Sequence, residues 1–150
     1  MDLQRCLDEV EYVLVDLIEE NDTTPVIVEG VKDQRALRTL GLKGTIITIN
    51  KGMSLSDFSD WLSNRYDRVI ILSDWDRRGG SLCRRLKELL HGRIKLDVEL
   101  RQRFSTYAMI KKVEGLPSWL ETVTKRLEET AANHDSSSKK KVSSNDESAM

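Results

Sequence analysis

The chain of 150 residues is long enough for one domain with its own core, and its 24 basic and 25 acidic residues leave a net charge of −1, which indicates neither a nucleic-acid binder nor a strongly acidic protein. Cys6 and Cys83 stand far apart, and His91 and His134 have no partners at zinc-ligand spacing, so we expect no zinc site and a reduced, cytoplasmic protein. We find no apolar run long enough to cross a membrane, and the acidic N-terminus is unlike a signal peptide.

Charge is unevenly distributed along the chain. Residues 1–24 hold eight acids and one base, a net charge of −7, whereas residues 77–112 hold eleven bases and three acids, a net charge of +8. The basic segment is compatible with a face that contacts phosphates. Solvated helix surfaces explain the same pattern, and charge alone favours this simpler explanation.

The chain starts with an amphipathic pattern. Residues 2–20 place leucine, valine and isoleucine at steps of three and four, which predicts a helix. We expect residues 1–23 to pack as this helix on a domain that covers residues 24–129. From Pro25 onward, short apolar runs alternate with helical segments, which is typical of a mostly parallel sheet with crossover helices. The predicted fold class is therefore α/β, with a Rossmann-like, four-stranded sheet flanked by helices.

The first half of this domain contains two predicted strands. Residues 26–28 form the first strand, which ends at Glu29 and Gly30, and a helix follows over residues 32–40. Residues 45–49 form the second strand. Ser54 is a helix-capping residue type and predicts the start of the next helix.

The second half contains the most basic part of the chain. Residues 69–72 form a third, continuously apolar strand, a helix follows over residues 81–90, and residues 94–100 alternate as a fourth strand. Residues 101–112 are ambiguous, and Pro117 predicts the first turn of a last helix. Residues 130–150 are rich in serine and lysine and predict a disordered tail, because they cannot bury enough apolar surface to offset the entropy of ordering.

Three acidic side chains follow two of the predicted strands. Glu29 follows the first strand, whereas Asp74 and Asp76 follow the third and, two apart in an extended segment, point the same way. In an open parallel sheet, functional groups collect at the carboxyl ends of strands, beside the point where the strand order reverses. Carboxylates with substrate phosphates are the usual ligands of magnesium. The pattern therefore predicts a magnesium site.

Simpler explanations exist for each acid. Asp74 and Asp76 can cap the following helix, and Glu29 can be a surface acid. Both groups, however, occur at strand ends of one sheet, each followed by glycine or by a helix that glycines open, and this combination favours metal binding.

Basic residues and glycines beside these acids predict phosphate contacts. A helix that opens at Gly79-Gly80-Ser81 presents free amides and the positive end of its dipole to an anion. Solvated surface charge is an equally good explanation for each base taken singly, and Trp75 is more simply a packing residue than a stacking platform. The residues predicted to contact phosphate are Lys32, Lys51, Arg77, Arg78, Gly79 and Gly80.

Two segments resemble the motifs of the Toprim family. The segment from Val26 to Asp33, VIVEGVKD, is similar to the family's glutamate motif, and the segment from Ile71 to Gly79, ILSDWDRRG, is similar to its Asp-x-Asp motif. The resemblance covers residues 24–112. Topoisomerases carry a further acid where Arg78 stands, so the chain is more similar to bacterial-type primases and to small stand-alone Toprim proteins. These include ribosomal-RNA maturation ribonucleases and archaeal proteins, whose segment beyond the core also resembles residues 111–117, KKVEGLP.

The resemblance implies a Toprim fold and a magnesium-dependent chemistry on phosphodiesters. It implies that Asp74 and Asp76 hold the metal and that Glu29 either completes the metal site or acts as the general acid or base. As an acid or base Glu29 would need its pKa raised by burial, whereas as a ligand it would stay ionised. Both roles remain open from the sequence, and all three acids are candidate catalytic residues.

The leading functional hypothesis is a magnesium-dependent nuclease that processes RNA, with selectivity supplied by the basic face or by a protein partner. The alternative is a non-catalytic module that docks nucleic acid through the same metal site within a larger RNA or replication assembly. A phosphoryl-transfer receiver or small-molecule phosphatase is a third hypothesis, which the pairing of Glu29-Gly30 with Asp74-x-Asp76 disfavours. Primase activity is disfavoured because a stand-alone domain lacks the regions that bind template and nucleotides.

Overall fold

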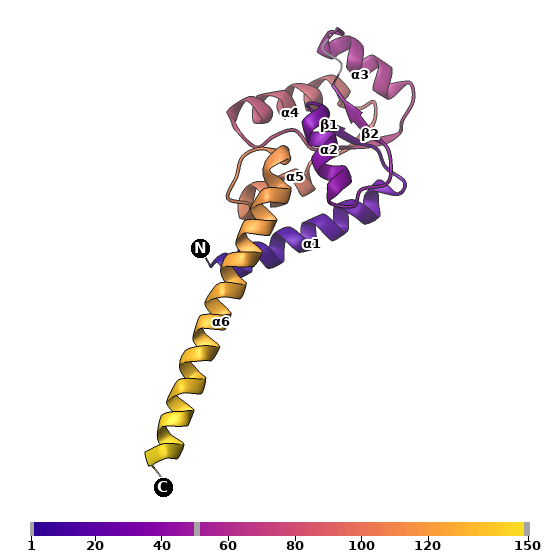
Figure 1. Cartoon of the computed structure of the whole chain (residues 1–150). Coiled ribbons are helices and arrows are strands. Elements are labelled where there is room, and N and C mark those ends of the chain that lie inside the picture. The colour runs from indigo at the N-terminus through magenta and orange to yellow at the C-terminus, as the bar shows by residue number, and fades with distance from the viewer. Residues whose placement is uncertain (1, 50–51, 149–150) are drawn as a thin grey trace.

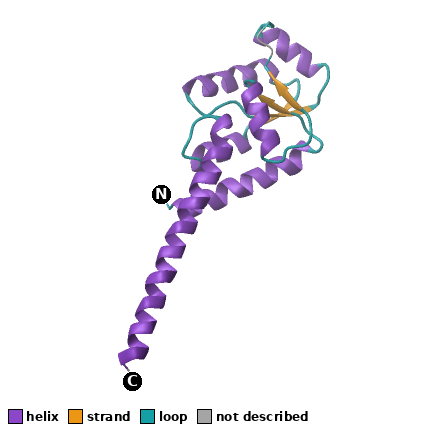
Figure 2. Cartoon of the chain, viewed as in Figure 1, coloured by secondary structure: helices purple, strands orange, loops and turns teal. Residues whose placement is uncertain are grey.

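Four short strands form one parallel sheet in the computed structural model, which describes residues 2–49 and 52–148. The strands are β1 (Val26–Val28), β2 (Ile46–Thr48), β3 (Arg68–Ile71) and β4 (Lys95–Asp97). They lie in the order β2-β1-β3-β4, with every neighbouring pair parallel, and Val26 of β1 is in register with Ile46 of β2 and Ile70 of β3. Figure 2 shows the strands surrounded by helices. The predicted α/β fold class with a four-stranded sheet is confirmed.

The crossover segments are helical, as parallel pairing requires. The helices are α1 (Leu3–Asn21), α2 (Val31–Thr39), α3 (Leu55–Ser63), α4 (Arg77–Leu90), α5 (Glu99–Tyr107), the short 3₁₀ helix η1 (Val113–Gly115) and α6 (Leu116–Ser148). Side chains cap several of their starts: Asp2 accepts from the Gln4 amide at 3.0 Å, and Ser54 from the Asp57 amide at 3.0 Å, as expected for Ser54.

Successive side chains of each strand point to opposite faces of the sheet, and this divides the core into two layers. On one face of the sheet Val26, Val28 and Leu72 pack in a cluster with residues of α1, α5 and the start of α6. On the other face Ile27 and Ile71 pack against α3 and α4. Because successive side chains of a strand point to opposite faces, a sheet covered on both sides requires the continuously apolar strands that the sequence contains.

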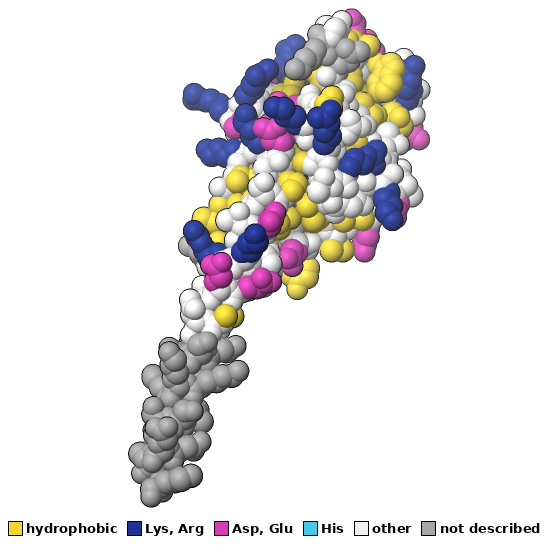
Figure 3. Space-filling model, in the orientation of Figure 1, with side chains coloured by type: hydrophobic (Ala, Val, Ile, Leu, Met, Phe, Trp, Pro, Cys, Tyr) yellow, Lys and Arg dark blue, Asp and Glu magenta, His cyan; other side chains and the backbone are white. Residues whose placement is uncertain are grey.

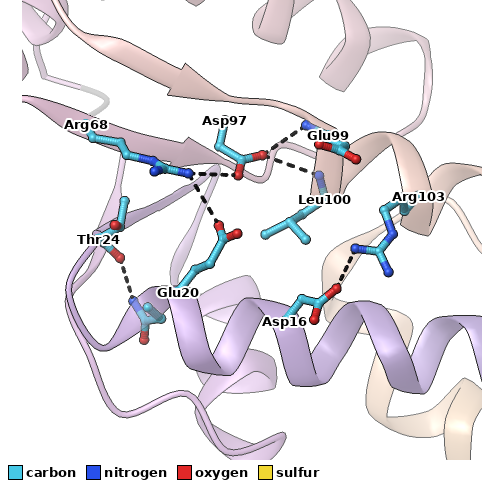
Figure 4. A network of polar contacts seen from close by, with 9 residues as sticks. Asp16, Glu20, Thr24, Arg68, Asp97, Glu99, Leu100 and Arg103 are labelled. Carbon is cyan, nitrogen blue, oxygen red and sulfur yellow. Dashed lines mark hydrogen bonds and ion pairs between the residues drawn. The ribbon is translucent and has the colours of Figure 1, made fainter.

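The acidic helix α1 is joined to the basic part of the chain by charged contacts (Figure 4). Arg103 of α5 donates to Asp16 of α1 at 2.7 Å. The Arg68 Nη2 atom lies 3.9 Å from Glu20 Oε2 and 3.6 Å from Asp97 Oδ2, at the ends of α1 and β4. Part of the uneven charge along the sequence therefore serves to dock α1 on the domain.

Two predicted boundaries were wrong. The helix expected at residues 81–90 already begins at Arg77, because Asp76 caps it and the Gly80 amide donates to the Asp76 carbonyl at 2.9 Å. The fourth strand, expected to reach residue 100, ends at Asp97. There the Asp97 carboxylate accepts from the Glu99 amide at 3.0 Å and starts α5, which occupies most of the ambiguous residues 101–112.

The last helix projects from the domain (Figure 1). Val123 is buried against the core, whereas the side chains of residues 128–134 are all exposed, as expected of a segment too poor in apolar residues to pack. The helix α6 extends to Ser148. The exposed side chains agree with the tail predicted from residue 130, which has too few apolar residues to pack on the domain. Of the helices in the described ranges, none is both long and apolar enough to span a membrane.

Candidate active site

The site lies where the strand order of the sheet reverses. From β1 the chain crosses first to β2 on one side and then to β3 on the other, so the carboxyl ends of β1 and β3 flank the switch point. Glu29 directly follows the β1 segment, and Asp74 follows β3 by three residues. The ends of adjacent parallel strands are the usual place for a ligand in such sheets.

Glu29 and Asp74 form a close carboxylate pair. Glu29 Oε2 accepts from the Asp74 backbone amide at 2.7 Å, and Asp74 Oδ1 accepts from the Val113 amide at 2.8 Å. Burial raises the pKa of Asp74 to about 6; the Val113 hydrogen bond opposes this rise, and the charge of Glu29 and a side-chain hydrogen bond with it add to the rise. The raised pKa means that the negative charge of Asp74 is disfavoured at this place, and a bound cation would offset the cost.

Two further acids that sequence reasoning missed lie beside this pair. Asp33, in the first turn of α2, is only 6% exposed, and its Oδ2 accepts from the Gly30 amide at 3.0 Å. Burial raises the pKa of Asp33, and the charge of Asp74 raises it further. Glu114 of η1 lines the cavity that opens over these acids. The only available signals were that Asp33 lies four residues after Glu29, inside the Toprim-like segment, and that Glu114 lies in the segment KKVEGLP.

Asp76 has a different role from Asp74. Its Oδ1 accepts from the Gly79 amide at 2.7 Å and so caps α4, which is the simpler explanation weighed for it from the sequence. Asp76 is not among the residues that line the cavity. Within the part of the chain that the structure describes, no three His, Cys, Asp or Glu side chains are arranged to hold a metal ion together. The participation of Asp76 in a metal site with Glu29 and Asp74 therefore stays a prediction.

The Glu29 and Asp74 pair nevertheless fits a divalent cation. Magnesium keeps several waters and is commonly held by one or two carboxylates with substrate phosphates, so a third protein ligand is not required. The closeness of two partly buried carboxylates and the raised pKa of Asp74 show the electrostatic strain that a cation would relieve.

Gly79 brings α4 close to the loop that carries Asp74. A Cβ atom added at Gly79 would lie 1.8 Å from the Asp74 carbonyl oxygen, closer than any side chain can approach, and Ser73 Oγ donates to the Gly79 carbonyl at 2.8 Å. The Gly79 and Gly80 amides both donate to Asp76, to its carboxylate and its carbonyl respectively. These amides are therefore occupied within the helix, which argues against the phosphate contacts predicted for them.

Two side chains hold the Asp74 loop from the other side. Arg101 of α5 donates through Nε to the Ser73 carbonyl at 3.0 Å and through Nη2 to the Asp74 carbonyl at 2.7 Å. The Trp75 indole donates to the Ile110 carbonyl, and its ring stacks on Phe104 with centroids 5.6 Å apart. Trp75 is thus a packing residue, as the simpler explanation from the sequence had it. Arg101 holds the loop through hydrogen bonds, and sequence reasoning missed this role.

A cavity of about 1490 Å³ opens over the acids. It is lined by five exposed basic side chains from α2, α4 and the segment before η1, and Figure 3 shows Lys and Arg side chains gathered over α4 and α2. The predicted phosphate contacts Lys32, Arg77 and Arg78 are among them, whereas Lys51 lies outside the described residues. The lining bases that were not singled out from the sequence are Arg85 and Lys112.

Comparison with known proteins agrees with this geometry. The model of the Toprim domain matches residues 24–113, which include both strand-end acids and the cavity bases. The chain belongs to the Toprim family.

Relatives of this Toprim protein are small archaeal proteins named UPF0292. The one from Thermoplasma volcanium is 40% identical over 103 residues, which cover 68% of this chain and 87% of the relative. The one from Methanocaldococcus jannaschii is 35% identical over 127 residues, covering 80% of this chain and 97% of the relative. These values place the chain among the stand-alone archaeal-type Toprim proteins.

The fold of this Toprim protein also matches a solved structure, described as a putative protein from Aquifex aeolicus. The TM-score is 0.60 at 24% sequence identity, and the match covers 69% of this chain and 94% of the other. It supports the fold alone. Membership of the Toprim family itself indicates a function connected with divalent metal ions and nucleic acid.

Proposed function

We propose that this Toprim protein is a magnesium-dependent phosphodiesterase that acts on nucleic acid, with RNA as the preferred substrate. The observation that carries the proposal is the Glu29 and Asp74 carboxylate pair at the sheet's switch point, facing a cavity whose lining bases can bind phosphates. The preference for RNA is supported by the similarity of the motif segments to those of the maturation ribonucleases.

The carboxylate pair would hold the cation. Glu29 and Asp74 each use one oxygen for a backbone amide, which fixes the orientation of both carboxylates before any ligand binds. When bound, magnesium supplies Lewis-acid polarisation of a phosphoryl oxygen. Asp76 likewise uses one carboxylate oxygen, for the Gly79 amide, and its other oxygen stays available to the metal.

The bases of the cavity would position the substrate. Lys32, Arg77 and Arg78 are exposed at the cavity wall, where they can bind phosphate oxygens on either side of the reacting bond. Charge that develops on phosphate oxygens in the transition state is stabilised by cations already in place. Binding and orientation by these residues therefore account for part of the expected rate acceleration.

The proposal is tested by cleavage of labelled structured RNA and matching DNA in magnesium, together with calorimetric titration of the metal. We expect cleavage by the wild type, and loss of both cleavage and metal binding in Glu29→Gln and Asp74→Asn. Asp67→Asn, an exposed acid at the opposite end of β3, should behave as the wild type. Equal cleavage by wild type and Asp74→Asn would refute the proposal.

One observation favours a second candidate, a non-catalytic module that docks nucleic acid through the metal. Within the described residues, no three acidic side chains are arranged to hold a metal ion together, so the site offers the Glu29 and Asp74 pair in place of the three acids expected from the family motif. In this case magnesium would strengthen RNA binding, Asp74→Asn would abolish that effect, and the wild type would leave RNA and DNA uncut. The same titrations and cleavage assays separate the two candidates.

A further inference from the structure

The cavity has an apolar lobe beside the charged end. The lobe is contributed by β2 and the residue after it, the loop before α3, α3 itself and the first half of α4. Its residues are Ile47, Ile49, Met53, Phe58, Trp61 and Leu82. Neither the carboxylate pair nor the proposed hydrolysis explains why apolar side chains line a cavity of this size at the surface.

The aromatic wall of this lobe is held rigidly. The rings of Phe58 and Trp61 are stacked with centroids 6.1 Å apart and planes 16° apart, and Tyr66 meets Trp61 edge-on at 6.4 Å. The Arg65 guanidinium lies over the Trp61 ring, 4.5 Å from its centroid. Phe58 is buried, whereas Trp61 is half-buried and lines the cavity, so the part of the Trp61 ring that its neighbours leave uncovered is open to a ligand.

A ligand that fits both ends must join a flat apolar group to an anion. Arg77, Arg78 and Arg85 of α4 lie along the cavity, and α4 also contributes Leu82 to the lobe, so the charged and apolar parts are continuous. A nucleotide has this chemistry, since its base stacks on aromatic rings and its phosphate binds guanidinium groups. Cavities for single small ligands measure roughly 300–1000 Å³, so about 1490 Å³ accommodates one nucleotide and parts of its neighbours.

We propose that the site takes an unpaired nucleotide of a single-stranded substrate, with its base in the apolar lobe against Met53 and Trp61 and its phosphate at the arginines of α4. The inference rests on the proposed function and adds the substrate class. A base inside a duplex cannot reach the lobe without breaking its pairing and stacking, which costs free energy that a single strand does not spend. The protein therefore selects single strands, loops and chain ends over continuous duplex.

The test measures binding and needs no turnover. Fluorescence anisotropy follows three labelled ligands in calcium: a short single-stranded oligonucleotide, the same strand with abasic sites at its central positions, and a blunt duplex of the same sequence. Gel electrophoresis after each titration shows that the ligands are intact. We expect the wild type to bind the single strand about tenfold more tightly than the abasic strand or the duplex, in line with the energy of stacking one base.

Variants assign this difference to the lobe. Trp61→Ala and Met53→Ala should reduce the tenfold preference for the strand with bases to about threefold or less, and leave the affinity for the abasic strand unchanged. The unchanged abasic affinity also shows that the variants are folded. Tyr12→Ala, an exposed aromatic residue on α1, should behave as the wild type.

Three outcomes would overturn the inference: equal affinity of the wild type for normal and abasic strands, equal affinity for duplex and single strand, or parallel loss of both affinities in Trp61→Ala and Met53→Ala. The inference and the proposed function fail separately. An absence of magnesium-dependent cleavage rejects hydrolysis but leaves the base preference intact, whereas loss of the base preference leaves the cleavage result as it stands.

Discussion

At the scale of single residues, Gly79 shows how tightly the site is built. It lies in the first turn of α4 under the loop that carries Asp74, and the Asp74 backbone leaves no room for a side chain. Gly80, the next residue, stands in a more open place, since a Cβ there would lie 3.7 Å from the Arg101 guanidinium, an ordinary contact. Two adjacent glycines thus have different physical roles.

This difference predicts opposite effects of alanine at the two positions. Gly79→Ala should lower the free energy of unfolding by about 2 kcal/mol or more, because backbone must move to admit the methyl group. It should also weaken magnesium binding by displacing Asp74. Gly80→Ala should be neutral or stabilise by up to about 1 kcal/mol, because alanine favours the helix. Urea unfolding and magnesium titration of the two variants are the measurements. Equal changes in stability for Gly79→Ala and Gly80→Ala would contradict the packing described.

Glu20 gives a second prediction at this scale. Burial and a hydrogen bond with Asp97 raise the pKa of Glu20 from 4.5, and Arg68 opposes them. Because the folded-state pKa is the higher one, the protonated carboxyl favours folding below about pH 4.5, and this contribution is lost as the pH rises through the folded pKa. Glu20→Gln should therefore be more stable than the wild type at pH 7.5 and nearly equal to it at pH 4.

Urea unfolding of both proteins at the two pH values tests this, with Glu19→Gln as the control because Glu19 is exposed on the same helix. The change should be confined to Glu20→Gln. A gain in stability of the same size at both pH values would show that ionisation of Glu20 is not its cause.

At the scale of elements, α5 positions the loop between β3 and α4. Arg101 crosses to the Ser73 and Asp74 carbonyls, while Arg103, one half-turn along the same helix, pairs with Asp16 of α1. The two arginines belong to the same basic segment of the sequence. Only one of them touches the site.

Arg101→Gln should therefore weaken magnesium binding by about tenfold, the lower end of the effect expected for residues that orient metal ligands. Arg103→Gln should leave metal binding unchanged and lower the free energy of unfolding by no more than about 1 kcal/mol, as expected for an ion pair that is partly open to solvent. Calorimetric titration and thermal unfolding of both variants are the measurements. Equal metal affinity in the two variants would remove the positioning role of Arg101.

At the scale of the whole molecule, net charge is a poor guide to the interaction surface. The chain carries −1 in total, yet α1 is acidic and the cavity is lined by basic side chains of α2 and α4. Figure 3 shows that Lys and Arg side chains gather on one part of the domain. A nucleic-acid chain would meet this local field, because charges farther than about 8 Å are largely screened at physiological salt.

The salt dependence of single-strand binding should show how many of the cavity bases contact phosphates. If three to five of them neutralise phosphates of a single strand, the logarithm of the association constant should fall with the logarithm of salt with a slope of about −2 to −3.5. Arg78→Gln should make the slope less steep by about 0.7. Lys125→Gln, an exposed residue of α6 paired with Glu121, should leave it unchanged. Equal slopes for all three proteins would place the nucleic acid elsewhere.

The sequence by itself determined the parallel α/β sheet, the strand ends that carry Glu29 and Asp74, and the cap at Ser54, because periodicity, apolar runs and capping act within a few residues. It also contained the Toprim motifs, which are continuous segments. It also predicted Asp76 beside Asp74 in a metal site, which stays a prediction, and the structure adds that Asp76 caps α4.

The tertiary structure alone decided which distant residues complete the site. Arg101 and Val113 reach the Asp74 loop from segments that are 27 or more positions away, Glu114 lines the cavity, and the apolar lobe joins β2, α3 and α4. The order of the strands and the packing of the helices bring these residues into contact, and both depend on the apolar surface buried in the whole core. A local sequence pattern shows that a side chain is acidic or apolar. It does not show which residue, distant in the sequence, will contact that side chain and give it its role.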